Sequence, residues 1–133
     1  MASSLVVLRT SVLLMFLLAV VTGLYASHVT RLSADAASQA AAAAAARAAA
    51  EVGWQCQAPL RSEVKTAATR AALSQIEHLA VQPVAIEVSA DACNLIVAVS
   101  AAPLDTRLGA LTATATACRS VGRSAALSIT GSC

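Results

Sequence analysis

The sequence predicts an α+β protein: a long N-terminal transmembrane helix continues into an Ala-rich helix, and a second helix then packs on a 3–4-stranded antiparallel sheet. Two observations predict this fold class. An uncharged apolar run passes, without any Pro, into a run of Ala. Near residue 84 the apolar residues change from helical spacing to strict alternation. We expect two parts: residues 1–52 form a membrane anchor and Ala-rich helical rod, and residues 53–133 form a small extracytoplasmic head.

The long helix is predicted over Thr10–Ala50. Residues 10–30 contain no Asp, Glu, Lys or Arg, and they are bounded by Arg9 and Arg31. A helix over these residues would be about 31 Å long, close to the hydrocarbon thickness of a bilayer. Beyond Arg31 most residues are Ala, the strongest helix former. We therefore expect the first half of the rod in a membrane and the second half outside it.

A cleavable secretory signal is the alternative to a retained anchor. Arg9 supplies a minimal basic region, and the residues Val21-x-Gly23 form a weak small-x-small site. The apolar run is longer than the core of a typical signal and its exit lacks a clean Ala-x-Ala, so retention is favoured. Flanking charge does not decide the orientation. The cysteines of the head favour a cytoplasmic N-terminus and an extracytoplasmic head at the cell membrane.

The Ala-rich segment Ser27–Glu51 leaves two interpretations open. Small side chains let another backbone approach closely, which predicts lateral packing against neighbouring subunits and a possible homo-oligomer through this helix. The segment could equally be a plain spacer. Arg31 and Asp35 lie one helical turn apart, and such an exposed pair adds little stability.

A second helix is predicted over Glu63–Ala80. We expect Gly53 to end the rod, Ser62 to cap the second helix and Pro83 to end it. Trp54 is expected to pack under the head. The apolar stripe of this helix consists of Val64, Ala68, Ala72, Ile76 and Leu79, and its polar face consists of Thr66, Arg70, Ser74 and Glu77.

Alternating residues then predict three strands and a weaker fourth. Val84–Ser89 and Leu95–Ser100 are the arms of a hairpin whose turn is Ala90–Asn94. Thr112–Ala117 is the third strand, and Ser124–Thr130 is the weaker fourth. A helix followed by antiparallel strands predicts that the helix lies on one face of the sheet.

The four cysteines lie in the head and are too widely spaced for a zinc site, which indicates disulfides: Cys56, Cys93, Cys118 and Cys133. Three connectivities are possible. We favour Cys56–Cys93, which ties the entry of the second helix to the hairpin, together with Cys118–Cys133, which ties the C-terminus to the third strand. The other two connectivities stay open.

The sequence gives little support to an enzyme, and we predict no catalytic, cofactor-binding or metal-binding residues. His28 lies at the membrane exit and His78 at an ordinary helix end, so neither pairs with a cysteine as a base. Glu87 is expected on a strand and Asp91 in a turn, so the two carboxylates do not converge. One Trp, one Tyr, one Phe and a net charge of +2 argue against a nucleic-acid surface.

One arrangement runs through most of the chain. An N-terminal anchor enters the Ala-rich segment Asp35–Ala49, then come Cys56, a helix, Cys93 and the strand Leu95–Val99. This layout resembles the TadE/TadG-like proteins of tight-adherence (Flp) pilus systems, especially short, Ala-rich, cysteine-containing members of the actinobacterial type. The resemblance implies a non-enzymatic minor pilin-like subunit or envelope assembly factor. Its partners would be a secretion ATPase, inner-membrane platform proteins and a major pilin, besides membrane lipid.

The chain departs from this pattern at its N-terminus. Pilin-like members often carry a Glu just inside the apolar segment, beside a prepilin-peptidase site, whereas no acidic residue precedes Asp35 here. A permanently anchored assembly component therefore fits the resemblance better than a shaft subunit. The alternative function is a small secreted, disulfide-stapled binding module released by signal-peptide cleavage.

Overall fold

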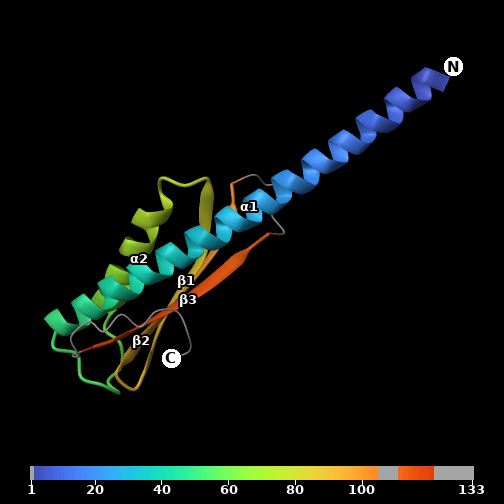
Figure 1. Ribbon diagram of the computed structural model, residues 1–133. Helices are drawn as coiled ribbons and strands as arrows, with labels where there is room; N and C mark the ends of the chain where they lie inside the picture. The colour runs from blue at the N-terminus through green and yellow to red at the C-terminus, as the bar shows by residue number, and fades with distance from the viewer. Residues whose placement is uncertain (1, 105–110, 122–133) are drawn as a thin grey trace.

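The computed structural model describes residues 2–104 and 111–121, and its longest element, helix α1 (Ala2–Glu51), is about 75 Å long at the rise of an α-helix (Figure 1). The first half of α1 projects alone, and the other described elements lie along its second half. The prediction of one continuous helix through Thr10–Ala50 is confirmed. No break occurs at Gly23, around which no other atom lies within 4 Å of an added Cβ.

The second half of α1 is packed against one further helix and a three-stranded antiparallel sheet. These elements are α2 (Ser62–Ile76), β1 (Val81–Asp91), β2 (Asn94–Pro103) and β3 (Ala113–Ser120), with strand order β1-β2-β3. Helix α1 contacts α2, β2 and β3, and α2 contacts β1. The predicted α+β fold with a long apolar helix is therefore confirmed, with α1 covering more of the sheet than α2 does.

The register of the strands decides which side chains face the helices. Val97 of β2 pairs with Val88 of β1 on one side and with Ala117 of β3 on the other. Because side chains alternate along a strand, this row and the residues two positions away point to the same face. That face holds the buried β2 residues Leu95, Val97, Val99 and Ala101. The opposite face carries Ser100 and Thr114, whose hydroxyl groups are hydrogen-bonded at 2.8 Å.

Alanines of α1 form a large part of the core. Five of them have no exposed surface and belong to one cluster with β2 and α2: Ala37, Ala41, Ala42, Ala45 and Ala49. A helix face made of methyl groups lets the larger side chains Val64, Leu95 and Val97 fill the space between helices and sheet. On this side the Ala-rich segment therefore packs within its own chain and is more than a plain spacer. A homo-oligomer through the exposed side of the segment stays a prediction.

The C-terminal end of α1 is closed by a defined backbone motif. Gly53 has a φ of +63°, its N–H donates to the carbonyl of Ala50, and the N–H of Trp54 donates to the carbonyl of Ala49. This is a Schellman motif, in which glycine takes the left-handed conformation at little cost. The predicted stop at Gly53 is confirmed. Trp54 is 7% exposed, which confirms that it packs within the head.

The predicted boundaries of α2 need correction. Ser62 is the first helical residue instead of the cap, and Arg61 holds the N-cap position without a side-chain hydrogen bond. The helix ends at Ile76, four residues before the expected end, because β1 begins as early as Val81. Pro83 lies inside β1, where an edge strand with a bulge tolerates the missing N–H.

The burial of α2 follows the predicted stripe except at its last residue. Val64, Ala68, Ala72 and Ile76 are buried. Leu79 is 39% exposed, since it lies beyond the helix end.

The hairpin and the third strand are confirmed, with longer strands than predicted. The turn between β1 and β2 is the pair Ala92–Cys93, and Ala92 has a φ of +50°. The predicted fourth strand, Ser124–Thr130, lies outside the described residues.

Replacing the buried Ala45 with leucine tests whether alanine is required in the core. The added atoms would have to enter a filled space, so Ala45→Leu should lower the free energy of unfolding by about 1–3 kcal/mol. The measurement is denaturant unfolding of the full chain in detergent, followed by the fluorescence of Trp54. Ala50→Leu, at an exposed position of the same helix, is the matched control and should change stability little. Equal effects of the two substitutions would contradict the assignment of the core.

Candidate membrane helix and disulfide-tied head

The first half of α1 exposes large apolar side chains on every side. Each large apolar residue from Leu5 to Tyr25 is at least 44% exposed. The helix Ser4–Glu51 has a window of mean hydropathy 2.4, none of which is buried, and it is long and apolar enough to cross a membrane. Exposed apolar surface of this extent is unfavourable in water, so the segment needs lipid or other apolar helices around it.

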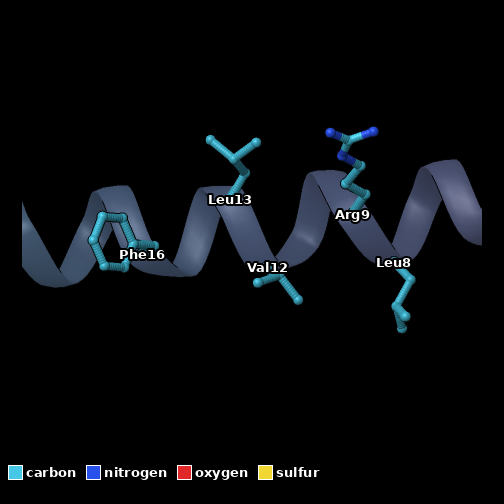
Figure 2. A pocket seen from close by; sticks show the side chains of 5 residues that line it. All are labelled: Leu8, Arg9, Val12, Leu13 and Phe16. Atoms are coloured by element: carbon cyan, nitrogen blue, oxygen red, sulfur yellow. The ribbon is translucent and has the colours of Figure 1, made fainter.

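The N-terminal turns of this helix carry a shallow hollow between side chains. It is lined by Leu8, Arg9, Val12, Leu13 and Phe16, all from α1. Figure 2 shows these side chains spreading outward from a single helix, with no second element facing them. Such a surface suits acyl chains or a neighbouring helix, because nothing encloses a small molecule there.

Two threonine hydroxyl groups in the apolar half of α1 have partners within the helix. The Thr10 hydroxyl donates to the carbonyl of Val6 at 3.0 Å, and the Thr22 hydroxyl donates to the carbonyl of Leu18 at 2.9 Å. A polar group in hydrocarbon is costly unless it is hydrogen-bonded. These residues therefore do not prevent the helix from entering a bilayer.

The part of α1 suited to lipid and the part covered by the head meet without a gap. The uncharged segment ends at Thr30, and Thr30 is itself only 1% exposed. Ser33, Ala34 and Ala37 follow as buried residues. Residues 34–49, which the sequence assigns to the rod, thus belong structurally to the head, and α1 has no bare stalk between its two roles.

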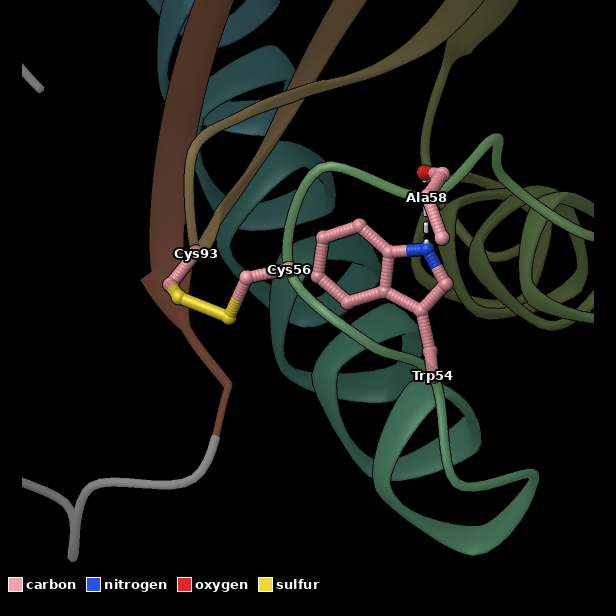
Figure 3. The surroundings of a disulfide bond; sticks show 4 residues. All are labelled: Trp54, Cys56, Ala58 and Cys93. Carbon is pink, nitrogen blue, oxygen red and sulfur yellow. Dashed lines mark hydrogen bonds between the residues drawn. A yellow bond between two sulfur atoms is a disulfide. The ribbon is translucent and has the colours of Figure 1, made fainter.

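At the far end of the head a disulfide joins the segment after α1 to the β1–β2 turn. Cys56 and Cys93 are bonded, with their Cα atoms 4.6 Å apart (Figure 3). The N–H of Gln57 also donates to the carbonyl of Ala92, at 3.3 Å. The favoured pairing of Cys56 with Cys93 is confirmed. The hairpin tip is thereby held against the end of α1.

Trp54 stabilises the segment after α1, which carries Cys56. Its indole Nε1–H donates to the carbonyl of Ala58 at 3.0 Å, and Figure 3 shows the ring beside the chain that carries Cys56. A buried tryptophan usually requires such a partner for its N–H. The ring therefore both fills the core and closes the loop from residue 54 to residue 58.

The second predicted disulfide is only partly described. Cys118 lies on β3 and is not a free thiol. Its predicted partner, Cys133, lies outside the described residues, so the pairing Cys118–Cys133 stays a prediction.

The polar residues considered for chemistry do not come together. His28 on α1 and His78 after α2 are exposed, as are Glu87 on the outer face of the sheet and Asp91 at the end of β1. Within residues 2–104 and 111–121, no three His, Cys, Asp or Glu residues are grouped so that they could hold a metal ion.

Removing the disulfide tests how strongly the hairpin tip depends on it. The bond closes a loop with a sequence separation of 37, so the double substitution of Cys56 and Cys93 by Ser should lower the free energy of unfolding by about 4 kcal/mol. Denaturant unfolding in detergent measures the loss. Ala90→Ser, at an exposed position of the same hairpin, should have almost no effect. A loss no larger than that of Ala90→Ser would show that the bond adds nothing to the fold.

No family model, no curated protein and no solved structure matches the chain. The resemblance to TadE/TadG-like proteins therefore stays a prediction that depends on the sequence layout alone.

Proposed function

We propose that the chain is a non-enzymatic, single-pass membrane component of a type IV pilus or secretion assembly of the Flp/Tad-like kind. It acts by packing its helix in the membrane and docking its head against other subunits. The observation that carries the proposal is that one unbroken helix, α1, presents bare apolar side chains over its first half and forms the core of the head over its second half. An anchor and a head joined in this way move as one body.

Rigid coupling is the property an assembly component needs. A flexible linker would let the head rotate independently of the anchor. Here α1 continues without a break through Gly23, and Thr30 is the first residue of α1 that is buried. A partner that tilts or displaces the anchor within the bilayer would therefore reorient the head outside it.

The disulfide supports the proposed topology. Disulfides form and persist outside the reducing cytoplasm. A head that contains Cys56–Cys93 fits the extracytoplasmic side, with the N-terminus in the cytoplasm. Arg9, at the start of the uncharged segment, is compatible with this orientation because basic residues favour the cytoplasmic flank.

The proposed partners are platform proteins and a major pilin, besides membrane lipid. They follow from the resemblance in sequence layout. The absence of an acidic residue before Asp35 favours a component that stays in the membrane over a subunit that is extracted into the filament.

A secreted binding module is the second candidate, and one observation favours it. Cleavage between Gly23 and Ser27 would remove no buried residue of the described part of α1, since the first buried residue of this helix is Thr30. The released chain would keep the complete alanine face of the core.

Photo-cross-linking within the membrane tests the proposed function. A photoreactive amino acid in place of Phe16, in the full chain expressed in its native host, should yield covalent adducts with a pilin or a platform protein, because this exposed part of α1 is the packing surface. The adducts are identified by mass spectrometry of the cross-linked peptides. The same group in place of Glu87, exposed in the middle of β1, should not give those membrane adducts.

Two results would contradict the proposal in different ways. Adducts with lipid alone would remove the assembly role and leave a simple anchor. N-terminal sequencing that finds the mature protein starting near Leu24 or Ser27, in the soluble fraction, would favour the secreted module.

A further inference from the structure

The apolar side chains exposed on the head collect at one end. Beyond the lipid-facing half of α1, five large apolar residues are exposed among those described: Leu32, Leu73, Leu79, Val84 and Leu104. Leu73 lies on α2. The other four, Leu32, Leu79, Val84 and Leu104, are 39–58% exposed, and we call them the proximal rim.

Chain connections bring three members of the rim, Leu79, Val84 and Leu104, to the end of the head that faces the free half of α1, and the fourth, Leu32, lies on α1 itself. The N–H of Leu104 donates to the carbonyl of Ala80 at 3.3 Å, so the residues after α2 and after β2 are neighbours. Val81 pairs with Pro103 at the same end of the sheet. Val84 occupies the bulge between Pro83 and Ala85, where its side chain is outside the regular ladder.

The position of the rim along α1 follows from the lengths of β2 and α1. The other end of the head is fixed at the end of α1 by the disulfide Cys56–Cys93. From there β2 (Asn94–Pro103) runs back along α1 for about 30 Å, which equals about 20 helical residues. Counted back from Glu51, this distance ends near Arg31, the residue that follows the uncharged segment 10–30 of α1. Figure 1 shows the start of β1 and the end of β2 beside this middle part of α1.

We propose that the proximal rim is a lipid-contacting surface that lies in the headgroup region of the bilayer from which α1 emerges. This inference rests on the proposed membrane anchoring. No linker separates the two parts, because burial by the head begins at Thr30. If residues 10–30 fill the hydrocarbon, the rim has to lie at the membrane surface.

Phospholipid is the occupant that this position selects. The rim continues the apolar surface of the lipid-facing half of α1, with Leu32 following Tyr25 and Leu24 along the same helix. Apolar side chains gain free energy when they enter the interface. The opposite end of the head, around Cys56 and Cys93, exposes no large apolar residue among those described. Contacts at the rim would hold the head upright and present that opposite end to partners.

Depth-dependent fluorescence quenching tests the rim. The full chain is reconstituted into vesicles of phosphatidylcholine and phosphatidylglycerol, with phosphatidylcholine brominated near the top of its acyl chains as the quencher. Trp54 is the only tryptophan and lies at the far end of the head, so the unsubstituted chain should keep its fluorescence. In a Trp54→Phe background, Leu104→Trp and Val84→Trp should each lose much of their fluorescence and shift their emission to the blue.

A third variant separates failure of the rim from failure of the anchor. Phe16→Trp, in the same background and with a deeply brominated lipid, reports insertion of α1. Quenching of this variant without quenching at either rim position would overturn the proposed lipid contact of the rim and would leave the proposed insertion of α1 standing. Absence of quenching in all three would overturn both. Quenching of Trp54 in the unsubstituted chain, to the same extent as at the rim, would show a head lying flat and would also overturn the inference.

Discussion

The contact between the alanine face of α1 and strand β2 is the interaction on which the molecule depends. Ala41 and Ala45 have no exposed surface, and they face a core that includes Val97 and Val99. This contact makes the second half of a very long helix the centre of a folded head. The first half, which cannot be stable in water with its apolar side chains bare, is thereby joined to the head by continuous helical backbone.

The head is packed along the second half of α1 and is bonded to it at the far end, and this determines its orientation. At one end the Schellman motif at Gly53, the Trp54 indole and the Cys56–Cys93 bond hold the hairpin tip. At the other end, the head begins to cover α1 at Thr30, where the uncharged segment stops. A head packed along a straight helix and bonded at its end has little freedom to turn relative to that helix. The proposed lipid contact and the proposed docking of subunits both use this restriction.

Much of the fold could be predicted because it follows from local signals. Absence of charge and of Pro predicted the long helix, alternation predicted the hairpin, and the preference of glycine for positive φ predicted the stop at Gly53. The role of the Ala-rich segment could not be predicted. Nearly every position there is Ala, so no stripe of larger residues marks the buried side, and only the packing of α2 and the sheet decides that Ala41 is buried while Ala36 is exposed. The end of α2 and the exposure of Leu79 also depend on the sheet, since the chain is part of β1 from Val81 onward.

The most direct test of the central claim is hydrogen–deuterium exchange of the full chain in lipid nanodiscs, resolved over residues 20–36. A single uninterrupted helix that is both anchor and core predicts slow exchange through Gly23 and on past Thr30, without a break, since each backbone N–H there is hydrogen-bonded within α1. A fast-exchanging segment between the membrane and the head would contradict this account, because anchor and head would then be two bodies joined by a linker.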